Sequence, residues 1–241
     1  MSLSPGGPDL ASLSSLDDPV RRRLYEVVTR QPGPVSRDEA ASAAGIGRAL
    51  AVYHLDKLVE SGLLTASYSR PPGRSGPGAG RPAKLYARSG REFAVTVPPR
   101  EYELAARLLV QAVEADPSGR SRTALAEAAR QLGTELGRAF RPDAAERDVA
   151  EQDAASWEVA ERDVEGMLTQ QGYEPCRGGD GVIRLRNCPF HQLAEQHRAV
   201  VCGMNLALVE GLVAGLGAGG WHPALDPRPG HCCVAIGGDR S

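Results

Sequence analysis

The sequence predicts an α+β protein with an N-terminal winged helix-turn-helix, a helical dimerisation middle and a small C-terminal α/β sensor domain. Three observations favour this organisation. Three helical segments precede a two-stranded ribbon, an Ala- and Glu-rich helical stretch follows, and all five cysteines lie where strands and helices alternate. We expect a disordered tail at 1–16, the winged helix-turn-helix at 17–97, a helical linker and dimerisation region at 98–153, and the cysteine-containing sensor domain at 154–241.

Three short helices are expected in the first quarter of the chain. In VRRRLYEVVTRQ the apolar residues recur at helical spacing directly after a proline. Ser36 and Glu39 have the spacing of a capping box, which begins a short second helix. The third helix is expected from about Arg48 to Ser61 and ends at Gly62, because glycine is favoured just beyond the last turn.

A two-stranded ribbon is expected after the third helix. LLTASYSR and AKLYARS, residues 63–70 and 83–89, read as strands. The segment between them, PPGRSGPGAGRP, is too rich in Gly and Pro to be helix or ladder. Three helices followed by such a ribbon predict a winged helix-turn-helix.

The outward face of the third helix and the ribbon carry the candidate DNA contacts. A helix fits the major groove, where side chains reach base edges, and arginines of a glycine-rich loop suit a narrow minor groove. For His54 a packed boundary position and a DNA contact are both open. The candidates are Arg48, Val52, Tyr53, His54, Lys57, Arg74, Arg81 and Lys84.

The charge is divided unevenly along the chain. Residues 1–97 contain 13 Lys and Arg against 9 Asp and Glu, a charge of +4, and residues 98–241 contain 15 against 21, a charge of -6. If the chain binds a polyanion, we therefore expect the first part to bind it.

The stretch GIGRALAVYHLDKLVESGLL, followed by GRSGPGAGRPAKLY, resembles bacterial winged-helix repressors of the ArsR and DeoR-like groups. The resemblance covers about residues 17–90 and implies sequence-specific binding of a homodimer to a near-palindromic double-stranded DNA operator. Two half-sites need two recognition helices, and this chain has one. The helices expected between residues 99 and 171, EYELAARLLVQAVEA, SRTALAEAARQLGTEL and a third from about 154, are the expected dimerisation surface.

The cysteines lack the close CxxC spacing of a zinc ribbon, so shared ligands must converge through the fold. We expect Cys188 and Cys202 at helix starts, where backbone amides favour thiolate. Cys232 and Cys233 are expected on a strand and therefore on opposite faces, so that only one joins a site. A fourth ligand is open between Cys176, Cys233 and His191. Buried apolar cysteines and a disulfide switch are the alternative interpretations.

The segment NCPFHQLAEQHRAVVCGMNLALVEGL, with a later cysteine on the final strand, is similar to the C-terminal half of SufR-type regulators, which sense an iron-sulfur cluster. The resemblance implies a repressor with a cluster, of the 4Fe-4S type, held by Cys188, Cys202 and Cys232. The state of the cluster then decides affinity for DNA. The chain adds Cys176 and Cys233 to the minimal pattern, which leaves the fourth ligand and a zinc ion open.

Several other classes are disfavoured by what the sequence lacks. No run of about 18 apolar residues would span a bilayer, and the N-terminal segment lacks the features of a secretory signal, so a cytoplasmic protein with no membrane partner is expected. No nucleotide-binding glycine loop, serine elbow or HExxH pair is present, which argues against an enzyme. The alternatives are a zinc, thiol-redox or small-ligand sensor on the same scaffold, and a cluster-containing redox enzyme with a DNA-binding module.

Overall fold

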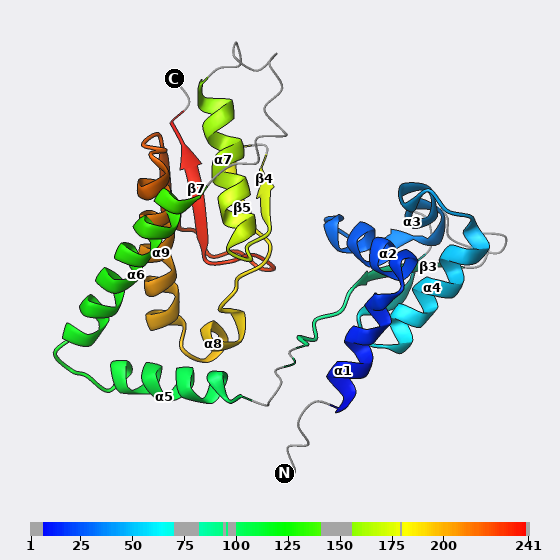
Figure 1. Cartoon of the computed structure of the whole chain (residues 1–241), viewed down its shortest axis with the longest axis horizontal. Helices are drawn as coiled ribbons and strands as arrows, with labels where there is room; N and C mark the ends of the chain where they lie inside the picture. Colours follow the sequence, from blue (N-terminus) through cyan, green and yellow to red (C-terminus); the bar gives the residue numbers. More distant parts are fainter. Residues whose placement is uncertain are drawn as a thin grey trace. The chain divides into compact units, whose positions relative to one another are not determined.

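The chain divides into two compact units in the computed structural model, residues 1–100 and 101–241. The structure describes residues 7–69, 82–93, 95, 100–140, 156–178 and 180–239. The division lies close to the boundary expected after residue 97. Figure 1 shows the elements of each unit coloured along the sequence.

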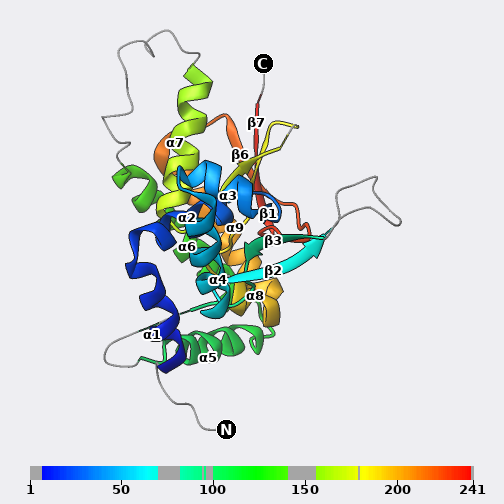
Figure 2. The same cartoon turned by 90° about the vertical axis from the view of Figure 1, so that its right-hand side faces the viewer.

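The first unit consists of helices followed by a small antiparallel sheet. Its sheet has the strand order β1-β3-β2, and β2 and β3 pair from Leu64 opposite Arg88 to Ser69 opposite Ala83. Figure 2 shows these two strands side by side. The elements are α1 (Gly7–Ser14), the 3-10 turn η1 (Ser15–Asp17), α2 (Pro19–Arg30), β1 (Val35–Ser36), α3 (Arg37–Ala44), α4 (Arg48–Glu60), β2 (Leu64–Ser69) and β3 (Ala83–Arg88).

The local signals expected in the first unit are present. The Ser36 hydroxyl accepts a hydrogen bond from the Glu39 amide at 3.2 Å, and the Glu39 carboxylate accepts one from the Ser36 amide at 2.7 Å. Gly45 ends α3 with φ 65°, a left-handed conformation that glycine adopts without strain. Leu24, Leu55 and the other apolar side chains of the core pack α2, α3 and α4 against the sheet. The predicted three helices and ribbon are confirmed.

The N-terminal segment differs from the prediction. Residues 1–16 were expected to form a disordered tail, but α1 and η1 occupy most of that stretch. Leu16 packs against the core of the unit, and the Asp9 carboxylate lies 3.8 Å from the Arg91 guanidinium. Because the polar and small residues of this segment dominate its composition, these tertiary contacts are not visible in the sequence pattern.

The second unit combines five helices with a four-stranded antiparallel sheet of order β4-β5-β7-β6 among the residues that the structure describes. β4 and β6 were not expected as strands, because both are short and contain proline. The elements are α5 (Tyr102–Glu114), α6 (Arg120–Ala139), α7 (Ser156–Gln170), β4 (Pro175–Arg177), β5 (Val182–Leu185), α8 (His191–Gln196), α9 (Arg198–Leu216), β6 (Trp221–Leu225) and β7 (Val234–Gly238).

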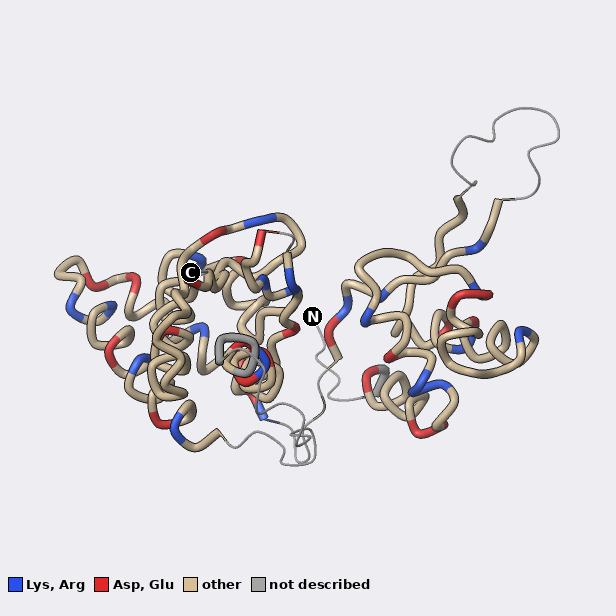
Figure 3. Tube along the Cα trace, turned by 90° about the horizontal axis from the view of Figure 1, so that it is seen from above, with Lys and Arg blue, Asp and Glu red and all other residues tan. Residues whose placement is uncertain are grey.

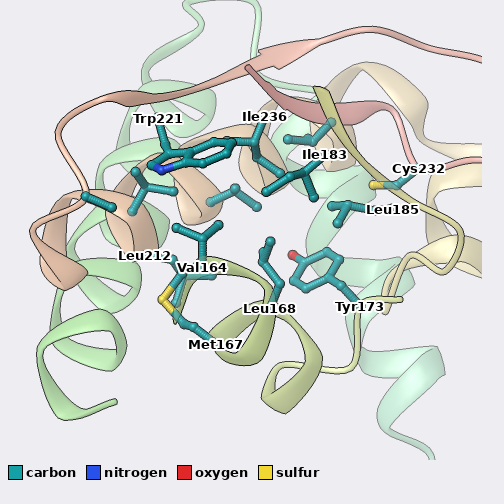
Figure 4. Packing of buried hydrophobic residues seen from close by; sticks show 14 of the residues in the cluster. Val164, Met167, Leu168, Tyr173, Ile183, Leu185, Leu212, Trp221, Cys232 and Ile236 are labelled. Carbon is teal, nitrogen blue, oxygen red and sulfur yellow. The ribbon is translucent and has the colours of Figure 1, made fainter. Parts of the chain in front are cut away.

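One face of this sheet packs against α7 and α9. Figure 4 shows side chains of α7 and α9 meeting those of β5, β6 and β7 there, among them Leu168, Leu212, Ile183 and Trp221. Successive residues of a strand point to opposite faces. Ile183 and Leu185 of β5 therefore face the helices, and Arg184 lies on the other face.

The expected middle region is not separate from the C-terminal domain. α6 packs along α9, and Figure 1 shows the two helices side by side. Gly133 and Gly137 of α6 meet Gly211 and Gly215 of α9, which brings the two backbones into contact. The spacing of apolar residues predicted α6 and α9 as helices. The glycines within these segments did not indicate that the two helices would pack against each other.

α9 is the single helix, within the described ranges, that is long and apolar enough to cross a membrane by length and composition. Its Val209 and Leu212 are fully buried against the sheet and its neighbouring helices. Half of its apolar stretch is buried inside the second unit.

Candidate functional site

The N-terminal half of α4 presents an exposed face in the first unit. Arg48 and Tyr53, both predicted as DNA contacts, are exposed, and Val52 is half-buried beside them. The Arg48 guanidinium lies 2.9 Å from the Asp38 carboxylate in the first turn of α3. An exposed ion pair of this kind contributes little to stability, so Arg48 can exchange Asp38 for a phosphate or a base edge at small cost.

His54 lies in the core rather than on the exposed face of α4. Its side chain is 7% exposed, and its Nδ1 atom has no hydrogen-bond partner among the described residues. The prediction left His54 open between core and DNA contact, and the structure places it in the core. Its position one turn before the buried Leu58 explains this, because residues four apart share a helix face.

Lys57 and Lys84 are both engaged within the first unit. Lys57 Nζ lies 2.7 Å from the Glu60 carboxylate on the same helix. Lys84 Nζ donates a hydrogen bond of 2.6 Å to Asp56 Oδ1, so the side chain is directed at α4. The carboxylate of Asp56 raises the pKa of Lys84 and keeps it charged.

The loop between β2 and β3, with the predicted contacts Arg74 and Arg81, lies outside the described residues. Two exposed side chains beside the predicted contacts were not identified from the sequence, Leu50 on α4 and Tyr68 on β2. A tyrosine in an alternating strand pattern is a weak signal, since half of a ribbon's side chains face solvent. Figure 3 shows Lys and Arg interspersed with Asp and Glu along the helices of the first unit.

Four cysteines from three segments gather at one edge of the core of the second unit. Cys188 follows β5, Cys202 lies in α9, and Cys232 and Cys233 directly precede β7. Asn205 Nδ2 lies within 4.0 Å of the sulfurs of both Cys188 and Cys232, and Cys202 and Cys232 are close enough to Cys233 to raise the pKa of its thiol. All four lie in or against the same apolar core cluster.

The backbone places these segments beside one another. The Cys232 amide donates a hydrogen bond of 2.7 Å to the Leu185 carbonyl, which holds the segment before β7 against the end of β5. The Asn187 side chain donates to the Gly172 carbonyl at 2.7 Å, which holds the loop of Cys188 against the start of β4. The long-range pairing of β5 with β7 is therefore what joins cysteines that are far apart in sequence.

The vicinal pair does not follow the strand rule that the sequence suggested. Cys232 and Cys233 precede β7 instead of lying in it, and both side chains join the same group. Both side chains are buried in the same core cluster, whereas the sequence placed them on opposite faces. A strand starting one or two residues later than predicted is the physical reason. Which of them binds a metal or cluster stays a prediction.

The surroundings of the group lower the pKa of Cys232. Bonds from the Cys188 and Cys233 thiols, and then from the Val234 amide and the Asn205 side chain, hold the pKa of Cys232 well below its usual range despite burial. The hydrogen bond to Cys232, together with burial, raises the pKa of Cys188 and of Cys233. The sequence instead favoured a thiolate at Cys188 and at Cys202. α9 begins at Arg198, so Cys202 lies in its second turn and not at the helix start.

Cys176 and His191 lie away from this group. Cys176 pairs in register with Arg184, on the face of the sheet opposite to α7 and α9. The His191 ring lies 3.3 Å from the Glu195 carboxylate on the exposed side of α8. Of the three candidates for a fourth ligand, Cys233 is the one that the fold brings to Cys188, Cys202 and Cys232.

Asn205 and Tyr173 adjoin the cysteine group and were not identified from the sequence. Asn205 Nδ2 donates to Cys232 Sγ at 3.2 Å and lies 4.0 Å from Cys188 Sγ. The Tyr173 hydroxyl donates to Asn205 Oδ1 at 2.5 Å. Figure 4 shows Tyr173 and Cys232 near Leu185. The signal for Asn205 is present in CGMNLAL, where a lone polar residue in an apolar helix follows Cys202 by three positions and so shares its face.

The group offers sulfur donors in an apolar, largely buried surrounding. Thiolates are the ligands of iron-sulfur clusters and also suit zinc and monovalent copper. Among the described residues no three His, Cys, Asp or Glu side chains are arranged to hold a single metal ion. The donor chemistry fits a thiolate-bound group, and the thiols are also suited to oxidation.

The comparisons with known proteins bear on the first unit. Residues 16–65, which span α2, α3 and α4, match the family model of a helix-turn-helix domain. The chain therefore contains a helix-turn-helix domain, which supports the predicted winged-helix regulator and its binding to DNA. The match ends before the second unit begins. No curated protein matches the chain.

Proposed function

We propose that the chain is a homodimeric transcriptional repressor whose affinity for a near-palindromic operator is controlled by an iron-sulfur cluster bound in the second unit. The helix-turn-helix match supports the DNA-binding part. The observation that carries the sensor part is the gathering of four cysteines from three segments at one core cluster, two of them beside Asn205. In this proposal Arg48, Val52 and Tyr53 of α4 face the DNA.

The ligands in this proposal are Cys188, Cys202 and Cys232, with Cys233 as the fourth. When bound, the cluster supplies a centre whose redox state and survival respond to oxidants and to iron supply. The chain itself supplies three things. It lowers the pKa of Cys232, it surrounds the sulfurs with apolar side chains that limit access of water, and it holds Cys188 and Cys232 beside Asn205 of α9.

The dimer in this proposal uses the exposed apolar side chains of α5. Tyr102, Leu104, Leu108 and Leu109 are large, apolar and at least half exposed on this helix. An exposed apolar group of this size is typical of an interaction surface. Because recognition of two half-sites requires two copies of α4, a second copy of this chain is the occupant we propose.

A physical connection runs from the cysteine group to α5. Val200 and Val201 of α9 pack against Val110 of α5. The His197 ring, at the start of α9, lies 2.8 Å from the Glu114 carboxylate at the end of α5. Loss of the cluster frees the segments that it joins, and any resulting movement of α8 and α9 acts on the dimer helix. An effector shifts DNA affinity by its differential affinity for the two states.

Anaerobic purification with iron, sulfide and zinc analysis tests the proposal, followed by DNA binding with and without the cluster. The duplex used is one selected from a random library by the wild-type protein. We expect Cys188→Ser and Cys232→Ser to lose iron and sulfide and to change DNA affinity. The matched control Cys176→Ser should keep the iron and sulfide content and the DNA affinity of the wild type. Absence of iron and sulfide from the wild-type protein would contradict the proposal of an iron-sulfur cluster. Zinc alone would support the zinc-sensing alternative.

A second candidate, a thiol switch, is favoured by the contact between the Cys232 thiolate and the Cys188 thiol. With hydrogen peroxide as oxidant, the Cys232 thiolate displaces hydroxide from the peroxide and becomes a sulfenic acid, and the Cys188 sulfur then forms the disulfide as water leaves. A reversible loss of two titratable thiols in iron-free protein, with a change in DNA affinity, supports this candidate. Cys176→Ser again serves as the control.

A further inference from the structure

Asn205 and Tyr173 form a buried polar pair in the core of the second unit. Asn205 is 0% exposed and Tyr173 is 1% exposed. Burying an amide and a phenol is costly unless their hydrogen bonds are made. The two side chains satisfy each other through the bond from the Tyr173 hydroxyl to Asn205 Oδ1. The remaining polar group of Asn205, its Nδ2, is directed at sulfur.

The chemistry of the partners fixes the orientation of the Asn205 amide. The amide NH₂ of Asn205 faces Cys232, because Nδ2 donates to Cys232 Sγ. Oδ1 then faces Tyr173, which must donate. Burial, followed by the negative charges of the cysteine group, raises the pKa of Tyr173 and keeps its hydroxyl proton in place. The direction of every hydrogen bond from Tyr173 to Cys232 is therefore determined.

We propose that Asn205 is a positioning residue, oriented by Tyr173, that holds the Cys232 sulfur in the direction required for binding the cluster. Hydrogen bonds to ligand sulfur are among the means by which a protein tunes a cluster. Asn205 Nδ2 lies between the sulfurs of Cys232 and Cys188, which come from different segments. One amide thus sets the position of two of the sulfurs, and the inference rests on the proposed function for its role toward the cluster.

The arrangement also explains why a polar residue occupies α9 at this point. Asn205 and Cys202 are three residues apart on one helix face, while Tyr173 precedes β4. The relay therefore links α9, the loop of Cys188 and the segment before β7. A leucine at position 205 would fill the same space without making these links.

The first test uses metal-free protein and hydrogen exchange of the Asn205 side-chain amide, followed by NMR. We expect slow exchange in the wild type, and exchange faster by about tenfold in Tyr173→Phe and in Cys232→Ala, the effect of one lost hydrogen bond. The control is Tyr86→Phe, since Tyr86 is an equally buried tyrosine of the first unit with its hydroxyl bonded to Asp56. Unchanged exchange in both relay variants overturns the relay.

The second test measures the lifetime of the reconstituted cluster in air. Removal of a group that orients a metal ligand typically costs 10-fold to 100-fold in affinity, so we expect a lifetime shortened about 10-fold in Asn205→Leu. Asn205→Asp keeps the size but removes the donor, so it should behave as Asn205→Leu or worse. Packing alone would leave Asn205→Asp and Tyr173→Phe like the wild type, and that result overturns the proposal.

The two tests separate the relay from the proposed function. If wild-type protein binds no iron and sulfide, the cluster proposal fails, and the exchange measurement on metal-free protein still decides whether the relay exists. If wild type binds the cluster and only the variants lose it quickly, both proposals are supported.

Discussion

Gly133 of α6 lies directly against Gly211 of α9, so close that neither position has room for a side chain. A Cβ atom on Gly211 would lie 2.1 Å from the Arg130 carbonyl oxygen, and one on Gly133 would lie 2.2 Å from the Leu208 carbonyl oxygen. Such close approach allows contacts between backbones that larger residues prevent. Because α9 also holds Cys202, the position of α6 and the position of the cysteine group are set by the same helix.

Gly211→Ala is expected to destabilise the second unit. The added methyl group meets backbone atoms that cannot rotate away, and overpacking of this kind costs typically about 1–3 kcal/mol. Gly203→Ala is the matched control on the same helix, because a Cβ there meets no atom within 4 Å. Its free energy of unfolding should rise by up to about 1 kcal/mol because alanine has the higher helix propensity.

Both tryptophans, 157 and 221, belong to the second unit, so their fluorescence during urea unfolding reports on its stability. Equal stability of the two variants would contradict the close packing.

Arg48→Ala is expected to weaken DNA binding. If Arg48 reads a base edge, the loss is about 1–3 kcal/mol for one position of the site, and if it holds a phosphate, the salt dependence of binding falls by about one counterion. Asp38→Asn should strengthen binding, because it releases Arg48 and removes a negative charge near the DNA. The measurement is anisotropy titration at several salt concentrations.

Arg30→Ala provides the control for Arg48. Arg30 is an exposed arginine of α2 in the same unit, outside α4 and the ribbon. Equal losses for Arg48→Ala and Arg30→Ala would show that only net charge matters, and α4 would then lose its assigned role.

Leu108→Glu is expected to convert a dimer to monomers. The substitution places a charge in the middle of the exposed apolar residues of α5, where a second copy would exclude water. Light scattering after gel filtration gives the mass directly. Leu225→Glu is the matched control, since Leu225 is an exposed leucine on β6 of the same unit. A dimer that survives Leu108→Glu would place the interface elsewhere.

The first unit was largely predictable because its signals are local. The capping box of Ser36 and the glycine turn at Gly45 depend on residues within a few positions, and both are present. The exceptions were the N-terminal segment, which forms α1 and η1, and His54, whose spacing places it at the boundary of the helix face so that only tertiary packing decides its side. The family match over residues 16–65 agrees with this local reading.

The second unit was less predictable because its organisation depends on distant pairings. The register of β5 with β7 brings Cys232 near Cys188, and no pattern within either segment indicates it. The start of β7 at Val234 explains why Cys233 lies in the same core cluster as Cys232. The close packing of α6 against α9 at Gly133 and Gly211 likewise brings together segments that are far apart in the chain. The cysteines in the sequence indicated sulfur chemistry, but only the fold shows which of them lie together.

The stability of the first unit is expected to fall at low pH partly through Asp56. Burial raises the pKa of Asp56, but hydrogen bonds from Lys84 and Tyr86 outweigh it, so the pKa lies below its usual value. A carboxyl group whose pKa is lowered by folding adds stability that is present above the unfolded pKa, about 3.9, and that is lost as the pH falls through the folded value. We expect the difference in stability between wild type and Asp56→Asn to be constant above about pH 5 and to shrink below about pH 4.

Hydrogen exchange of the β2 and β3 amides at a series of pH values measures this difference for the first unit alone. The bonds from Lys84 and Tyr86 join α4 to β3, so these amides should lose protection in Asp56→Asn at neutral pH. Glu26→Gln is the control, because Glu26 is an exposed carboxylate of α2 whose ion pair with Arg30 spans 3.8 Å. A pH-independent difference between wild type and Asp56→Asn would mean that the side chain acts through packing and not through its charge.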